Sequence, residues 1–189
     1  MTREEAYNFL NTLIKSPNLI KHHLAAEATM REIGQTLKEK DPNINIEDWG
    51  LVGLLHDADY EITRETPQQH ALVLEQKING LVRPEIIYAI KCHNCKNLGI
   101  EPKSLMDWAI YTCDELTGFI IACALVLPDK KIASVTPDFV LSKMKVSSFA
   151  KAVDRNQIML CEGKLGIPLT EFVQITLQGM QKISNELGL

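Results

Sequence analysis

The stretch GLLHDADYE, residues 53–61, runs an apolar segment directly into His56 and Asp57. Burying an imidazole or a carboxylate alone is costly, because each needs a hydrogen-bond partner or an opposite charge. A metal ion would supply that charge. The segment IEDWGLVGLLHDA, residues 46–58, reads as a short helix, so the pair lies at the end of a buried helix. This position predicts that other histidines and acids of the chain gather at the same place.

The size and composition indicate one ordinary globular domain. The chain has 189 residues, of which 46% are hydrophobic and 23% are charged. A chain of this length is expected to bury about 70% of the surface of its unfolded form, so it needs no disulfide or structural metal for stability. The net charge of −4 argues against an extended nucleic-acid surface, although a local basic pocket remains compatible with it.

The absence of a signal-peptide pattern and the spacing of the cysteines predict a cytoplasmic protein. The start MTREEAYNFL lacks the pattern of a signal peptide, and the longest apolar run, residues 118–127, is short for a membrane span. The chain has five cysteines, and they lack the spacing of a disulfide framework, so we expect them to be reduced thiols. Cys92 and Cys95 form a single C-x-x-C, which lacks the second pair that a structural zinc site needs. We therefore expect a cytoplasmic protein without a membrane partner.

The apolar periodicity is helical throughout, and no segment alternates like a β-strand. Thr2 and Glu5 have capping-box spacing, as do Ser104 and Asp107 before the longest apolar segment. The sequence therefore predicts an all-α, single-domain fold. The expected helices cover residues 2–15, 17–39, 46–58, 66–79 (with Thr66 as N-cap and Gly80 after its end), 84–94, 104–127, 137–144, 148–162 and 168–187.

Six polar residues fall on inward helix faces or at helix ends: His22, His56, Asp57, His70, His93 and Asp114. Any one of them alone is more often a core residue with ordinary hydrogen-bond partners than a metal ligand. A buried mid-helix carboxylate such as Asp114, however, needs a partner for its charge. Imidazole with carboxylate suits iron, manganese, zinc, cobalt or nickel, whereas magnesium and calcium prefer oxygen ligands. His23 points about 100° away from its neighbour His22 and is expected to lie outside this group.

In chain order these residues resemble the H…HD…H…H…D pattern of the HD-domain superfamily of metal-dependent phosphohydrolases. The resemblance covers residues 18–127 and implies a single HD-type helical bundle, with a helical cap over residues 128–189. It implies that His22, His56, Asp57 and Asp114 hold a first metal, and that Asp57 bridges to a second metal held by His70 and His93. Two transition metals per chain are expected, with iron or manganese ahead of zinc, cobalt and nickel.

One difference from the family pattern restricts the activities that the resemblance implies. Many phosphodiesterases of the superfamily continue HD-x-G-K, where the lysine approaches a phosphate. Here Ala58, Asp59 and Tyr60 follow the pair, and no lysine is present. This difference argues against cyclic-dinucleotide phosphodiesterase activity.

The expected activity is hydrolysis of a phosphate ester or anhydride in a nucleotide-like or other small phosphorylated substrate, with a metal-activated water as nucleophile. Asp57 is the central catalytic candidate, and Glu61 and Asp59 are candidates for the acid or base, with solvated loop carboxylates as the alternative. Residues 143–158, KMKVSSFAKAVDRNQI, are rich in basic side chains. Arg155, Lys145 and Lys151 are therefore predicted to bind substrate phosphate, with a solvated basic face as the alternative.

Three other functions remain open. Some HD-fold proteins with the same ligands are di-iron oxygenases, but their insertions before the last aspartate are longer than the 21 residues that separate His93 from Asp114 here. Similar small proteins hydrolyse dinucleoside polyphosphates, which is our favoured specific substrate class. A non-catalytic nucleotide-binding module would be expected to lack a ligand, and none is missing. A homodimer is compatible with all of these functions.

Overall fold

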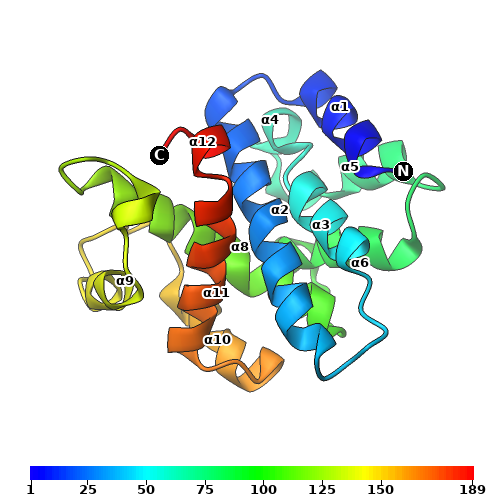
Figure 1. Ribbon diagram of the computed structural model, residues 1–189. Helices are drawn as coiled ribbons and strands as arrows, with labels where there is room; N and C mark the ends of the chain where they lie inside the picture. The colour runs from blue at the N-terminus through cyan, green and yellow to red at the C-terminus, as the bar shows by residue number, and fades with distance from the viewer.

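The computed structural model describes residues 1–189 and confirms the predicted all-α, single-domain fold (Figure 1). One continuous hydrophobic core of 43 buried residues includes side chains from both the first 127 residues and the C-terminal segment. The helices are α1 (Arg3–Leu13), α2 (Pro17–Lys38), α3 (Ile46–Leu55), α4 (Tyr60–Thr63), α5 (Leu72–Ile78), α6 (Pro84–His93), α7 (Cys95–Leu98), α8 (Leu105–Leu125), α9 (Pro137–Met144), α10 (Arg155–Leu165), α11 (Leu169–Lys182) and α12 (Ser184–Leu187), with 3-10 turns η1 (Pro67–Gln69) and η2 (Ile132–Ser134).

Local capping fixes several helix starts where the sequence predicted them. The Glu5 N–H donates to the Thr2 hydroxyl at 3.2 Å, and the Thr2 N–H donates to the Glu5 carboxylate at 2.7 Å. Ser104 and Asp107 form the same reciprocal pair at the start of α8. Both capping boxes satisfy N–H groups that have no partner inside the helix, so they define where α1 and α8 begin.

Helix α2 lies at the centre of the molecule, with α3 on one side and α11 on the other, and α8 passes behind them (Figure 1). Helices α2 and α3 approach closely at Gly53, where a Cβ atom would lie 2.5 Å from the Ala26 carbonyl oxygen. Only glycine fits at this crossing. The close crossing sets the position of the end of α3, where His56 and Asp57 follow.

The predicted helix over residues 66–79 is wrong, because the chain breaks in its middle. Thr66 makes no side-chain cap, η1 ends at Gln69, and Ala71 has a left-handed φ of 70° before α5 begins. The cause is a distant side chain: the buried Asp59 carboxylate accepts from the N–H groups of Ala71 and Leu74. These bonds satisfy N–H groups at the start of α5 and place His70 outside a helix.

The C-terminal helices differ from the prediction in their boundaries. The helix over residues 137–144 is confirmed as α9, whereas the one expected over 148–162 begins only at Arg155. Asp154 caps this start by accepting from the N–H groups of Asn156 and Gln157. The helix expected over 168–187 is divided at Ile183 into α11 and α12.

Helix α8 is the one helix that is long and apolar enough to cross a membrane. Most of its apolar stretch is buried inside the protein against other helices. Its composition therefore reflects its place in the core.

Candidate metal centre

The structure brings all six predicted ligand residues together in two adjacent groups. His22, His56 and Asp114 form the first group, and Asp57, His70 and His93 form the second. The possible ligand atoms within each group lie within 4.8 Å of one another. They come from the first turns of α2, the end of α3, the break before α5, the end of α6 and the middle of α8, so the site is assembled from five separate segments.

Asp57 joins the two groups through its two carboxylate oxygens. Its Oδ1 lies 2.9 Å from His70 Nε2 and 3.1 Å from His93 Nε2. Its Oδ2 faces the other group, 3.7 Å from His22 Nε2 and 3.9 Å from His56 Nε2. This is the placement of a carboxylate that can bridge two cations.

Asp114 completes the first group from the middle of α8. Its Oδ1 lies 3.0 Å from His22 Nε2 and 3.4 Å from His56 Nε2, and the two Nε2 atoms are 3.1 Å apart. The side chains of His22 and Asp114 are 20% and 22% exposed, whereas His56 is fully buried. The first group therefore reaches solvent on the side of His22 and Asp114.

The histidine rings are oriented by hydrogen bonds on the nitrogen that faces away from the cluster. His56 Nδ1 donates to the Gly53 carbonyl at 2.8 Å, and His93 Nδ1 donates to the Ile90 carbonyl. A carbonyl can only accept, so the proton lies on Nδ1 and the Nε2 lone pair of each neutral ring points into the cluster. Such partners are typical of metal-binding histidines.

The predicted acid–base role of Asp59 is not supported, because the structure uses its carboxylate to orient His70. Asp59 is fully buried, and its Oδ1 accepts from His70 Nδ1 at 2.8 Å and from the Ala71 N–H at 3.2 Å. Its Oδ2 accepts from the Leu74 N–H at 2.8 Å. Asp59 is therefore a positioning residue, which accepts from His70 Nδ1 and so directs the Nε2 atom of that ring at Asp57.

The arrangement of these lone pairs fits a bound cation. His70 Nε2 and His93 Nε2 are 2.8 Å apart, and both face Asp57 Oδ1. In their neutral forms three electron-pair donors would face one another there, which is unfavourable unless positive charge lies among them. Imidazole and carboxylate donors of this kind suit divalent transition metals. The residues present therefore fit a bound metal ion in each group.

The pKa values show the same preference for positive charge. Burial acts to lower the pKa of His56, but Asp57 and Asp114 outweigh it and raise the pKa to about 9. Burial also opposes the charged form of His70, but Asp57 and Asp59 raise its pKa to about 9. Burial acts to raise the pKa values of Asp57 and Asp114, yet the neighbouring histidines hold both well below the usual range. Protons and metal ions would therefore compete for the same lone pairs.

The Glu61 carboxylate, a predicted acid or base, makes a structural contact. It accepts hydrogen bonds from the backbone N–H groups of Lys15 at 3.0 Å and Ser16 at 2.8 Å. Glu61 thereby ties the first turn of α4 to the connection between α1 and α2. The structure supplies no contact between this carboxylate and the six ligand residues.

The predicted phosphate contact of Arg155 is not supported, because its guanidinium is used within the fold. It donates to the main-chain carbonyls of the turn that precedes α10, and it lies over the Phe119 ring at 5.1 Å. Lys145 and Lys151 are exposed, and phosphate binding by them stays a prediction. The carbonyls that accept from Arg155 belong to Met144, Val146, Phe149, Ala150 and Val153.

His23 lies outside the two groups, as predicted, but it is a buried neighbour of the cluster, which the sequence did not indicate. Its ring centroid lies 5.3 Å from that of His56, its exposure is zero, and neither ring nitrogen makes a hydrogen bond of normal geometry, although the Leu54 backbone lies nearby. Burial, with the nearby His56, lowers the pKa of His23 well below its usual value, so the ring is neutral. Periodicity placed it away from His22, and α3 covers the face to which it points.

Replacing His23 by leucine is expected to stabilise the protein. The change removes buried polar atoms without partners, whose desolvation costs about 1–3 kcal/mol, and keeps most of the side-chain volume. For a chain of this size each kcal/mol corresponds to roughly 2–4 °C in Tm. Thermal unfolding followed by circular dichroism measures the change, with His23→Ala as the control that leaves a cavity. A lower Tm for His23→Leu would show that the imidazole has a polar partner in solution.

Comparison with known proteins returned no relatives: no protein-family model, no curated protein and no solved structure matches this sequence. The function is therefore inferred from the geometry of the two groups.

Proposed function

We propose that this protein is an HD-type metal-dependent phosphohydrolase that acts on a small phosphorylated compound, with dinucleoside polyphosphates as the favoured class. The observation that carries the proposal is the position of Asp57, whose two oxygens each face a separate group of imidazoles. A shared carboxylate between two sets of nitrogen ligands is what a pair of cations requires, and paired cations are common in enzymes that hydrolyse phosphate esters.

The ligands divide naturally between two cations. His22, His56 and Asp114 would hold the first, His70 and His93 would hold the second, and Asp57 would contact both. Divalent cations held there would supply positive charge to a phosphoryl group and lower the pKa of a nearby water toward neutrality.

The protein contributes orientation and burial to this chemistry. The Gly53 and Ile90 carbonyls hold the rings of His56 and His93, so their nitrogens need little rearrangement during a reaction. His56 and His93 are nearly inaccessible, whereas His22 and Asp114 are partly exposed. A phosphorylated substrate would therefore approach from the side of His22 and Asp114.

The first test is the metal content of protein purified without chelators, for the wild type, Asp57→Ala and the control Asp138→Ala, which changes an exposed acid on α9. The wild type and Asp138→Ala should contain about two transition metals per chain, and Asp57→Ala should have lost at least one. Manganese-loaded wild type should release phosphate from p-nitrophenyl phosphate or hydrolyse a dinucleoside polyphosphate, with a rate at least about a hundredfold above that of Asp57→Ala.

The same samples separate the other functions. Iron-loaded protein that consumes oxygen and releases no phosphate would identify an oxygenase. Wild-type protein that binds no metal after reloading with manganese or iron would contradict the enzyme proposal and leave a nucleotide-binding module.

A further inference from the structure

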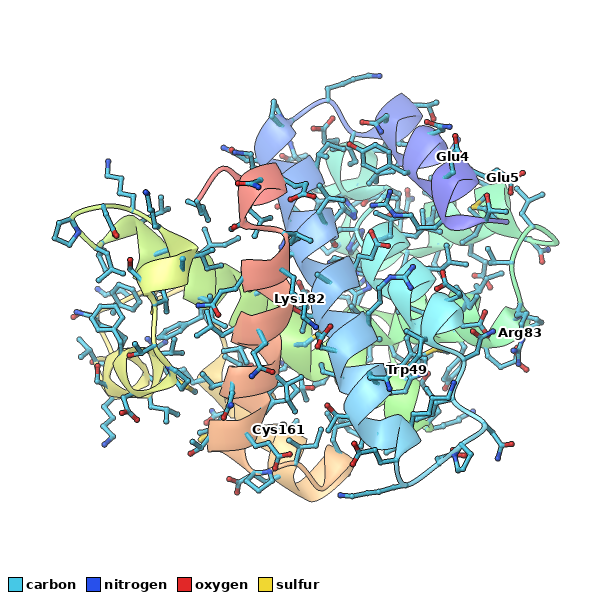
Figure 2. The ribbon with its side chains drawn as sticks, in the orientation of Figure 1. Glu4, Glu5, Trp49, Arg83, Cys161 and Lys182 are labelled. Atoms are coloured by element: carbon cyan, nitrogen blue, oxygen red, sulfur yellow. The ribbon has the colours of Figure 1, made fainter.

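A cavity of about 400 Å³ lies away from the metal centre. Its volume is within the range of roughly 300–1,000 Å³ that is usual for small-molecule sites. It is lined by the connection between α2 and α3 and by the first turns of α3, α6 and α8, and none of the six ligand residues lines it. Figure 2 shows two of its lining residues, Trp49 and Arg83, on the same side of the molecule.

The cavity and the metal centre lie at different positions along the same helices. Trp49 lines the cavity and precedes His56 by seven residues, and Tyr88 lines it and precedes His93 by five. Helix α8 also begins at the cavity and carries Asp114 further along. At about 1.5 Å per helical residue, the two sites are separated by roughly 8–11 Å along α3 and α6. The cavity is therefore a separate site that shares its walls with the metal centre.

The cavity has aromatic walls that are held in place. Trp49 is only 4% exposed, and a Cβ atom at Gly34 would lie 3.1 Å from its Cδ2, so the indole fits closely against α2. The Tyr88 hydroxyl donates to the Glu101 carbonyl at 2.8 Å, and Lys103 Nζ lies 4.9 Å from the centroid of the Tyr88 ring. Fixed aromatic walls favour a flat ring, because stacked or edge-on rings gain energy beyond their buried area.

The charges around the cavity disfavour an anionic ligand. The Arg83 guanidinium is already paired with Asp48 at 2.8 Å, and the acidic side chains outnumber the basic ones by four to two. A phosphate or carboxylate group would be repelled there, whereas N–H groups could donate to the carboxylate oxygens. The charged residues that line the cavity are Asp41, Asp48, Glu85, Asp107, Arg83 and Lys103.

We propose that this cavity binds an uncharged, flat nitrogen heterocycle of nucleoside size, and that it is a second ligand site distinct from the metal centre. The ring would lie against Tyr88 and the exposed edge of Trp49, and its N–H groups would donate to the carboxylates of Asp41 and Glu85. A ligand held there would contact the first turns of three helices that carry metal ligands further along. The proposal does not depend on the phosphohydrolase activity, because binding is measured directly.

Isothermal titration of the metal-loaded full chain with adenosine tests the proposal. Saturable one-to-one binding is expected, and Tyr88→Ala should weaken it by about tenfold, the loss expected for one stacked base. The control is Tyr60→Ala, which removes an aromatic side chain that is 41% exposed and lies edge-on to His70 at the metal centre. No heat at about 5 mM adenosine would overturn the proposal. Weaker binding by Tyr60→Ala alone would also overturn it, because the ligand would then be at the metal centre.

A second pair of variants covers the case in which Tyr88→Ala fails to fold. Leu105 and Leu125 lie at the two ends of α8 and are 37% and 50% exposed, but only Leu105 lines the cavity. Leu105→Trp should fill the space and reduce adenosine binding by about tenfold, whereas Leu125→Trp should leave it unchanged. Equal affinities for both variants would contradict the assigned location.

The preference of the cavity for an uncharged ligand is tested by comparing adenosine with adenosine 5′-monophosphate. Both are titrated into Asp57→Ala, in which the metal centre is impaired, so that phosphate binding there does not interfere. The monophosphate should bind at least about tenfold more weakly, because its phosphate meets the acidic lining. Equal or tighter binding of the monophosphate would overturn the preference for an uncharged ligand.

Discussion

Replacing Gly53 by alanine is expected to cost the protein a large part of its stability. The added Cβ would lie 2.5 Å from the Ala26 carbonyl oxygen, and backbone of a packed helix cannot move aside as a flexible side chain can. Overpacking a protein core costs about 1–3 kcal/mol, and the cost is larger when the clash is with backbone atoms. The whole free energy of unfolding of a protein is only roughly 5–15 kcal/mol. The Gly53 carbonyl also accepts from His56 Nδ1, so separation of α2 and α3 would displace a proposed metal ligand as well. Chemical denaturation followed by circular dichroism measures the loss.

The matched control is Gly163→Ala in α10. Gly163 is exposed, and a Cβ atom there would have no atom within 4 Å. Alanine favours a helix over glycine by up to about 1 kcal/mol, so this variant should be slightly more stable than the wild type. Similar unfolding midpoints for Gly53→Ala and Gly163→Ala would contradict the tight crossing of α2 and α3.

Replacing Asp59 by asparagine is expected to release the second metal and to leave the first in place. Asparagine has one acceptor oxygen where Asp59 uses two, so its NH₂ group would face either His70 Nδ1 or the Leu74 N–H. The His70 ring would lose its orientation toward Asp57. Loss of such an orienting partner typically weakens metal binding by about 10–100-fold. Metal content after dialysis should fall from about two per chain to about one.

The control for this prediction is Glu61→Gln, a change of the same chemistry two residues away. The Glu61 carboxylate holds the connection between α1 and α2, so its amide should disturb that turn and not the cluster. Two retained metals in both variants would show that Asp59 is not needed to orient His70. Loss of both metals from Asp59→Asn would show that the two groups cannot be occupied separately.

The parts of the fold that depend on local signals could be predicted from the sequence. The capping boxes at Thr2 and Ser104 involve residues three positions apart, so a short window contains all the information. The six candidate ligand residues were recognisable because a polar residue on an apolar helix face is costly without a partner. Their order along the chain also matched one known pattern. The structure agrees with this prediction by placing them in two adjacent groups.

The features that the sequence could not reveal depend on partners distant in the chain. The break at Ala71 occurs inside a helical pattern, because Asp59 takes the hydrogen bonds of N–H groups 12 and 15 residues away. Arg155 looked like an exposed cation, but the turn before it supplies carbonyls that satisfy its guanidinium. The burial of His23 depends on how closely α3 lies on α2. Composition and periodicity contain none of these relations.

The position of α11 against α2 has a consequence for the newly made chain. A Cβ at Gly179 of α11 would lie 2.9 Å from the Ala28 carbonyl of α2, and Lys182 pairs with Glu32 at 2.6 Å. Figure 2 shows Lys182 on the α11 surface next to α2. At about 5–20 residues per second, ribosomes need on the order of 10 s to make the intervening chain. For that time the face of α2 that α11 later covers stays exposed to solvent, so this part of the core is completed last.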